Sequence, residues 1–292
     1  MGPRPMAWSR DRDGTSDDRS RKQRMKRIQL TAPDYGLTFG IDRALRQLAQ
    51  DGLLSAIGCV VASDLWSREY LPLRDAVDAV RHHTRVGLTL TLTGPHAPLS
   101  VRGRELFGEQ LPRARWWRWR DRLRLVPDEV LAEETDAQFT CFEEFYQRPA
   151  EFLHVGDDLL ACPRIARVVL KQTGLRRVRP SIVSPFPTDP AARPGRAEKR
   201  LARLARENGL RIVPRAPSFP TSPGRKALEQ HVWRGLNGQE DGAVVLCQPG
   251  EVDDRLRRSE PRAAQEARQA QLDFLRSQAF SLLIVEKDIF LY

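Results

Sequence analysis

Three consecutive segments give the clearest indication of the fold class. SAIGCVVA (Ser55–Ala62) has the composition of a strand buried on both faces, LPLRDAVDAVRH (Leu71–His82) has helical spacing, and VGLTLTLT (Val86–Thr93) alternates as a strand does. Leu73 and Val77 fall on one stripe of the helix, which could then pack against the two strands. A strand, a helix and a second strand at this spacing predict two parallel strands joined by a crossover helix.

The same alternation extends over most of the chain. Further strands are expected at Arg27–Leu30, Phe152–Val155, Arg176–Arg179, Leu210–Val213, Ala243–Cys247 and Phe280–Val285. Helices are expected at Gly40–Gln50, Val126–Tyr146, Pro163–Thr173, Ala197–Asn208, Leu228–Leu236 and Ala263–Gln278, with a proline-rich loop at Ser184–Arg196. Seven or eight such units favour an α/β fold, namely a distorted (β/α) TIM-like barrel of about seven parallel strands over residues 26–292. Functional residues then belong after the carboxyl ends of the strands.

Composition narrows the class of protein. The 292 residues carry a formal net charge of +10 but contain no run approaching the ~20 apolar residues of a membrane-spanning helix. Residues 1–25 are polar and charged without periodicity, so we expect a disordered extension, and Met25 resembles an ordinary start. The segment lacks the apolar region of a secretory signal, and the four cysteines are scattered. Reduced cysteines in a cytoplasmic protein are therefore expected.

Six short motifs occur in an order that resembles one family. They are TAPDYGLT (Thr31–Thr38), DGLLS (Asp51–Ser55), GLTLTLT (Gly87–Thr93), LHVGDDLLACP (Leu153–Pro163), VRP (Val178–Pro180) and CQPG (Cys247–Gly250). The chain is similar in these segments to YdjC/ChbG-type (HpnK-like) carbohydrate deacetylases, whose corresponding motifs read like NADDFGLS, DGLLTS, GLHLTLT, LDSHQHVHLLP, VRLP and CHPG. The resemblance implies a distorted barrel that removes acetyl groups from N-acetylated sugars with a divalent metal.

The resemblance also shows which reactive positions differ. The first Asp of the family's DD pair, by resemblance the base, is Pro33 here, whereas Asp34 keeps the position of a metal ligand. Thr89 replaces a histidine ligand, and Gln248 stands at the catalytic histidine of CHPG. The alternating histidines of the fourth motif become Gly156, Asp158 and Leu160. Without these groups the ordinary deacetylase mechanism is not expected, and no cofactor is expected with it.

A rebuilt acidic site is an alternative. Asp34, Asp157 and Asp158 all follow strands, with His154 just before the last two, and three carboxylates would suit magnesium better than zinc. A divalent metal, magnesium or zinc, is expected only under this alternative. The simpler interpretation is that Asp157 and Asp158 are solvated loop acids that cap the helix after Pro163.

Other residues are candidates for contacts with a ligand. Thr89, His154 and Arg179 occupy motif positions, and His96 lies in a loop on the same expected face. The segment 113–125 interleaves six arginines with three tryptophans, and a helix here would place Trp116, Trp119 and Leu123 on one stripe. It is interpreted as a helix docked on the barrel, as a carbohydrate-binding lid, or as an element that binds an anionic or membrane surface.

These observations lead to three hypotheses. The first is a YdjC-like deacetylase scaffold that is catalytically impaired and binds an acetylated sugar or other carbohydrate, or regulates an active relative. The second is a divergent metal-dependent hydrolase that uses Asp34, Asp157 and Asp158. The third is a binder of anionic surfaces through residues 113–125. A homodimer is a candidate assembly, a membrane span is not expected, and nucleic acid is not favoured as a partner because the basic segment is short.

Overall fold

The computed structural model describes residues 26–188, 192–221, 225–236 and 239–292. The expectation for residues 1–25 lies outside this described part of the chain. No helix among the described residues is long and apolar enough to cross a membrane.

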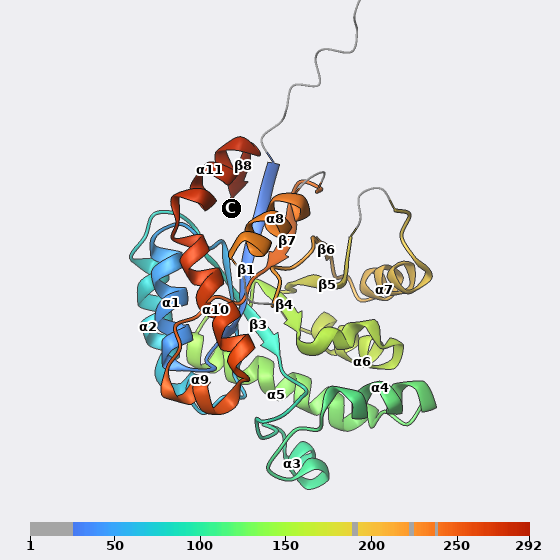
Figure 1. Cartoon of the computed structure of the whole chain (residues 1–292). Coiled ribbons are helices and arrows are strands. Elements are labelled where there is room, and N and C mark those ends of the chain that lie inside the picture. Colours follow the sequence, from blue (N-terminus) through green and yellow to red (C-terminus); the bar gives the residue numbers. More distant parts are fainter. Residues whose placement is uncertain (1–25, 189–191, 222–224, 237–238) are drawn as a thin grey trace, which may run out of the picture.

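Seven parallel strands form a closed barrel (Figure 1). Each strand pairs with the next along the chain from β2 to β7, and β1 pairs with both β2 and β7. The prediction of a TIM-like barrel with about seven parallel strands is confirmed. The strands are β1 (Lys26–Tyr35), β2 (Ala56–Cys59), β3 (Arg85–Leu90), β4 (Phe152–Val155), β5 (Ser181–Pro187), β6 (Ile212–Arg215) and β7 (Ala243–Leu246). An additional strand, β8 (Ile289–Leu291), pairs with the beginning of β1.

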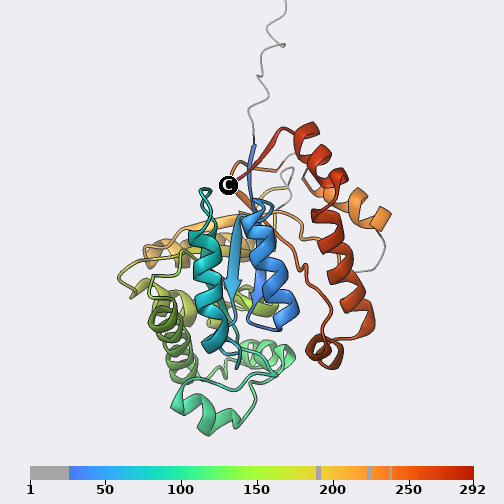
Figure 2. The ribbon, with the colours of Figure 1, turned by 90° about the vertical axis from the view of Figure 1, so that its left-hand side faces the viewer.

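Helices follow the strands and cover the outside of the barrel (Figures 1 and 2). The long covering helices are α1 (Phe39–Gln50), α2 (Trp66–Asp78), α5 (Asp128–Tyr146), α6 (Pro163–Gly174), α7 (Arg196–Glu207), α8 (Arg225–Gly235) and α10 (Arg262–Leu275). Shorter elements are α3 (Val101–Phe107), α4 (Ala114–Leu123), the 3-10 helix η1 (Gly156–Ala161), α9 (Asp254–Ser259) and α11 (Gln278–Glu286). Between β3 and α5, helices α3 and α4 are an insertion into the repeating pattern.

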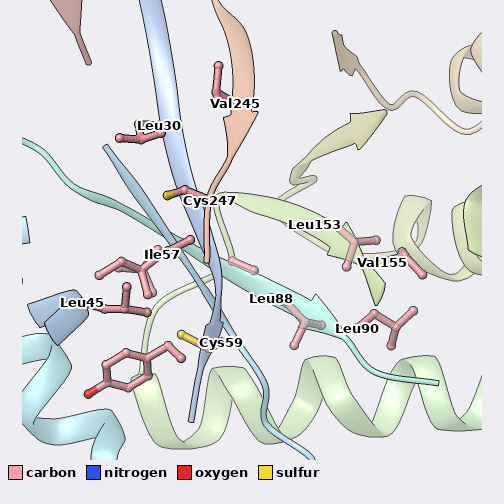
Figure 3. Packing of buried hydrophobic residues seen from close by; sticks show 14 of the residues in the cluster. Leu30, Leu45, Ile57, Cys59, Leu88, Leu90, Leu153, Val155, Val245 and Cys247 are labelled. Atoms are coloured by element: carbon pink, nitrogen blue, oxygen red, sulfur yellow. The ribbon is translucent and has the colours of Figure 1, made fainter. Parts of the chain in front are cut away.

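Strand alternation divides the apolar side chains into two clusters. Ile57, Leu88, Leu153 and Val245 point outward and pack with helix residues such as Leu45 (Figure 3). Their neighbours along the strands point inward and form a separate buried layer inside the barrel. That inner layer consists of Ala56, Phe152, Val183, Val213, Val244 and Leu246. The barrel is therefore filled across its middle, as small barrels generally are.

Two expected strands were wrong. Residues 176–179 form no strand, and the fifth strand is Ser181–Pro187, which begins before the expected proline-rich loop and overlaps its first residues. Prolines lower strand propensity, but here the neighbouring strands supply the pairing. Residues 280–285 belong to helix α11, because a short apolar run fits a helix as well as a strand. The sheet instead gains β8 a few residues later.

Candidate functional site

A cavity of about 550 Å3 lies at the carboxyl ends of the barrel strands. Seven of the residues singled out from the sequence line it: Asp34, Thr89, His96, His154, Asp157, Asp158 and Gln248. Pro33 from β1 also lines it, and so do Glu260 and Arg268 from the C-terminal part of the chain. The cavity therefore lies where parallel-barrel geometry predicts a site.

Three sequence candidates lie elsewhere. Arg179 precedes β5 at the opposite end of the barrel, where its Nε donates to the carbonyl of Gly174 at 3.1 Å. Trp116 and Trp119 are on α4 and are absent from the cavity wall. The expected helix forms, but the stripe of Trp116, Trp119 and Leu123 is not the face that it buries. Trp117 is the buried residue, whereas Trp119 and Leu123 are exposed.

The carboxylate of Asp34 forms a buried ion pair with an arginine from the C-terminal part of the sequence. Arg268 on α10 donates from Nη1 to Asp34 Oδ2 at 2.8 Å. The same guanidinium donates from Nε and Nη2 to the two carboxylate oxygens of Glu260, at 2.8 and 2.7 Å. Arg268 is only 6% exposed. Burial opposes its charge, but the attraction of Asp34 and Glu260 outweighs burial and raises the pKa of Arg268 above its ordinary value.

Gln248 completes the contacts of Asp34. Its Nε2 donates to Asp34 Oδ2 at 3.1 Å, and its backbone N–H donates to Gln271 Oε1 at 2.6 Å. Asp34 Oδ2 thus accepts from both Arg268 and Gln248. A neutral amide in this position can orient the carboxylate or a ligand by hydrogen bonding, but it lacks the titratable nitrogen that a general acid requires at neutral pH.

Thr89 is held toward β1. Its hydroxyl donates to the carbonyl of Pro33 at 2.7 Å, and the side chain is buried. The hydroxyl fits here because residue 58 on the intervening strand is glycine. A Cβ at Gly58 would lie 2.4 Å from Thr89 Oγ1 and 3.0 Å from the Cα of Pro33. The three strands therefore approach closely at this level of the barrel.

His154 lies beside Thr89 in the β3–β4 register and also lines the cavity. Its Nδ1 is buried and has no hydrogen-bond partner among the described residues. Burial lowers the pKa of His154 to about 4, and the nearby Arg215 adds to this effect, although the carboxylate of Asp34 opposes it. The imidazole is therefore neutral at pH 7, with one nitrogen in need of a polar partner.

Asp157 and Asp158 follow β4 in an unusual backbone conformation. Their φ angles are 54° and 53°, in the left-handed region that non-glycine residues rarely adopt. Asp158 pairs with Arg215, whose Nη1 lies 2.8 Å from Oδ1. Asp157 Oδ2 accepts from the hydroxyl of Thr93 at 2.6 Å. The two side chains thus engage different partners.

The interpretation of these acids as caps of the following helix was wrong. At the beginning of α6, the backbone N–H groups of Arg164 and Ile165 donate to Asp121 Oδ1, at 2.8 and 3.3 Å. Asp121 comes from α4, so the insertion supplies the cap that the local sequence does not.

The donor set does not fit a divalent metal. No group of three or more His, Cys, Asp or Glu side chains among the described residues is placed to hold an ion. Asp34 Oδ2 already accepts from the Arg268 cation, and Asp158 is paired with Arg215. A metal at Asp34 would sit against a buried positive charge, which is unfavourable at such short range. The structure therefore does not bring Asp34, Asp157 and Asp158 together as a rebuilt acidic centre.

His96 approaches the cavity from the loop after β3. Its pKa is lowered by burial and by the charge of Arg255, while Asp64 partly opposes the shift. The neighbouring Arg255 and Asp64 form an ion pair with each other, with Nη1 and Oδ2 3.0 Å apart. His96 is therefore a second neutral imidazole at the cavity wall.

Sequence reasoning missed the two residues that govern the charge of the site. Arg268 lies within the expected helix Ala263–Gln278 and Glu260 lies just before it, and no motif singled out either residue. They lie eight residues apart, and the turn of the chain between α9 and α10 brings Glu260 against Arg268 at the cavity wall. The one available signal was that polar Arg268 and Gln271 share a helix face with Leu272 and Leu275.

Comparison with known proteins agrees with the barrel. The family model described as YdjC-like protein matches residues 27–286. A cellobiose-phosphate cleavage protein from Enterococcus faecalis V583 superposes with a TM-score of 0.71 at 16% identity, covering 91% of this chain and 97% of that one. At this identity the likeness shows the fold alone. No match was found among the curated proteins.

Two deacetylase structures are more distant. A peptidoglycan N-acetylglucosamine deacetylase has a TM-score of 0.45 at 11% identity, covering 91% of this chain and 85% of that one. The T48 deacetylase with substrate has a TM-score of 0.42 at 10% identity, covering 92% and 88% respectively. These two likenesses have no bearing on the residues of the cavity.

Proposed function

We propose that this chain, which belongs to the YdjC-like family, binds a carbohydrate in the mouth of its barrel and does not perform metal-dependent deacetylation there. The observation that carries the proposal is the Arg268 guanidinium bound to Asp34. A cation that belongs to the protein itself satisfies the carboxylate that the family resemblance assigns to a metal. The scaffold of a carbohydrate deacetylase is retained, and its metal chemistry is replaced.

The residues at the other reactive positions support loss of catalysis. Pro33 offers no side chain that accepts a proton, and Thr89 already donates its hydroxyl to the Pro33 carbonyl. Gln248 stands at the family's catalytic histidine and donates to Asp34. Metal activation of water, proton abstraction and proton donation each contribute orders of magnitude to a hydrolytic rate. Their combined absence removes the ordinary route.

The cavity has the chemistry that sugar hydroxyls require. Its volume is within the range of small-molecule sites. Asp157 offers carboxylate oxygens at the rim, His154 offers an unpartnered Nδ1 at depth, and Gln248 offers an amide oxygen. A sugar has both donors and acceptors on adjacent carbons, so it could bond to such mixed groups at once. The fit of a polyhydroxy ligand therefore supports retention of binding without turnover.

The runner-up is a divergent metal-dependent hydrolase. It would require Arg268 to leave Asp34, which would cost both of its buried ion pairs. The two functions differ in one measurable respect, because only the hydrolase would bind a divalent ion in competition with Arg268. A regulatory role toward an active relative, a homodimer and a cytoplasmic location stay predictions.

The proposal is tested by measuring binding and turnover on the same protein. Purified full-length chain is titrated calorimetrically with N-acetylglucosamine oligosaccharides, and acetate release is assayed with magnesium, zinc or manganese added. We expect saturable binding and no acetate above that of a protein-free control. Metal-dependent acetate release would overturn the loss of catalysis, and absence of saturable heat with these sugars would overturn the binding role.

A matched pair of variants locates the ligand. Asp157→Asn keeps a residue that tolerates the left-handed backbone but removes a charged acceptor, so we expect sugar affinity to fall about tenfold. Asp254→Asn makes the same chemical change on α9, at a side chain that is 83% exposed and outside the cavity wall. Its affinity should equal that of the wild type. Equal losses in both variants would place the ligand elsewhere.

A further inference from the structure

Helix α4 presents a basic and apolar face that the sugar site does not use. It lies in the α3–α4 insertion at the same end of the molecule as the carboxyl ends of the barrel strands (Figure 1). Segment 113–125 contains six arginines and a single acidic residue, Asp121. Because Asp121 is engaged with the beginning of α6, the outward charge of the segment is entirely positive.

The helix is anchored so that this face points outward. Trp117 is 1% exposed, and its indole N–H donates to the carbonyl of Leu92 at 2.6 Å. Its ring also packs edge-on against Phe107 and Trp116, with centroids 5.7 and 4.9 Å apart. Together with the Asp121 cap, these contacts fix the rotation of α4 about its axis. The opposite side chains are thereby held toward solvent.

The outward face has two adjacent strips. Helical spacing places Arg115 and Arg122 along one strip and Trp119 and Leu123 along the next. Arg118 lies beside the first strip, but its Nη2 donates to the carbonyl of Asp157 at 2.8 Å. Trp119 is 56% exposed and Leu123 is 47% exposed. Leu125, just beyond the helix, is 52% exposed as well. Arg120 is engaged within the segment, where its Nη1 donates to the carbonyl of Leu125 at 3.4 Å and its guanidinium lies over the ring of Trp116. Arg115 and Arg122 have no contact of this kind with a described residue.

We propose that α4 docks the protein on an anionic lipid surface. Trp119 and Leu123 enter the headgroup region of the bilayer, and Arg115 and Arg122 contact lipid phosphates. A tryptophan beside leucine on one strip, with arginines on the next, is the side-chain pattern of helices that lie in a membrane interface. This inference is independent of the proposed sugar binding, since it uses none of the cavity residues.

The same face is a poor match to nucleic acid. A ten-residue helix is only about 15 Å long, so it offers few phosphate contacts. Exposed Leu123 and Leu125 have no counterpart in a phosphate backbone, whereas acyl chains and the headgroup boundary accept them readily. Charge and apolar exposure together therefore favour a lipid surface.

The experiment is co-sedimentation of the full-length protein with vesicles. Mixed phosphatidylglycerol and phosphatidylcholine vesicles are compared with phosphatidylcholine alone at low and high salt. We expect partitioning onto the anionic vesicles that weakens as salt is raised. The double variant Arg115→Glu and Arg122→Glu should partition at least about tenfold less, because each arginine near an anionic surface contributes separately. Leu123→Ser should lower partitioning by a smaller factor and leave its salt dependence intact.

A charge-matched control separates docking from net charge. Lys199→Glu with Arg200→Glu makes the same change in charge on the exposed face of α7. It should partition like the wild type. An equal loss in this control, or equal binding of the wild type to neutral vesicles, would overturn the proposal. Tighter binding to a single-stranded oligonucleotide than to anionic vesicles, lost in the α4 double variant, would overturn it as well. Thermal melts followed by circular dichroism verify that the variants fold.

Discussion

The two ends of the barrel each contain an arginine with little exposure, and the two arginines are held in different ways. At the amino ends of the strands, Arg85 has an 18% exposed side chain and donates to Gln29 Oε1, to the Glu151 carbonyl and to Ser181 Oγ. At the carboxyl ends, Arg268 has a 7% exposed side chain and lies between two carboxylates. One arginine is satisfied largely by neutral groups, and the other by opposite charges.

This difference distinguishes two kinds of buried arginine. Arg85 is a plug, meaning a side chain that closes the end of the barrel, and Arg268 belongs to a compensated site, meaning one in which its charge balances buried carboxylates. Neutral groups accept the shorter hydrogen bonds of Arg85, which ties β3 to β5 through Ser181. Its one carboxylate contact is longer, with Nε 3.4 Å from Glu151 Oε2. Arg268 is paired with carboxylates, and one of them, Asp34, occupies a position at which the family resemblance implies a metal ligand. The arginine thus supplies the positive charge that a metal would supply there. The inner apolar layer separates the two arginines, so each end can be altered without reaching the other.

The largest effect is expected from removal of Arg268. Arg268→Met leaves Asp34 and Glu260 without their shared cation, in a region where their side chains are only 13% and 22% exposed. We expect the free energy of unfolding to fall by about 3–5 kcal/mol, measured by urea denaturation at pH 7. Adding Glu260→Gln to this variant should recover part of the loss, because one uncompensated charge disappears.

The matched variant at the other end is Arg85→Met. It removes hydrogen bonds that involve mostly neutral partners, so the expected loss is smaller, about 1–3 kcal/mol. An Arg85 variant that is less stable than the Arg268 variant would contradict the distinction between plug and compensated site.

His154 is expected to have a smaller effect on the free energy of unfolding, and this effect depends on pH. Burial lowers the pKa of His154 to about 4, whereas an unfolded histidine titrates near 6.5. The unfolded chain therefore binds more protons between these values, so this residue makes stability fall as pH drops from about 6.5 to 4. The shift corresponds to at most about 3 kcal/mol.

His154→Gln should flatten the stability profile in that pH window. Denaturant midpoints measured at several pH values provide the test. His83→Gln, at a side chain that is 72% exposed, is the control and should keep the wild-type profile. Identical profiles for the wild type and the His154 variant would show that the imidazole titrates normally.

The smallest effect is expected from the hydroxyl of Thr89. Thr89→Val leaves the buried carbonyl of Pro33 without its donor, which should cost about 1–2 kcal/mol. Thr93→Val removes a hydroxyl bonded to exposed Asp157 and should change stability by less than about 0.5 kcal/mol. Thermal denaturation of the two variants side by side checks the order. If Thr93→Val lowered stability more than Thr89→Val, the expected order would be wrong and the side chains at the rim would be the more tightly packed.

Much of the fold could be predicted from the sequence, because strands and helices alternate with clear periods. The strands near Val86 and Ala243 and the helix near Gly40 lie close to their expected positions. β5 was misplaced because Pro185 and Pro187 hide a strand whose pairing comes from its neighbours. The residues of α11 were misassigned because four to six apolar residues have no distinctive period.

The site was predictable to the level of its location, but its charge balance was not. Motif positions identified Asp34, Thr89 and Gln248, and all three line one cavity. The ion pair of Arg268 with Asp34 joins residues 234 positions apart. No local pattern reports such a contact, because it depends on how α10 packs beside the barrel mouth. Likewise, spacing alone could not tell that Trp117, and not Trp119, would be the buried residue on α4.

The filled middle of the barrel determines how a ligand can enter and leave the cavity. Phe152, Val213 and Leu246 belong to a layer that closes the floor beneath the cavity. Molecules must therefore arrive and depart through one opening, and a polymer cannot thread through the protein. A long polysaccharide could insert a terminal unit into the cup or lie across its rim, but it could not be processed by sliding. Release of one occupant has to precede capture of the next.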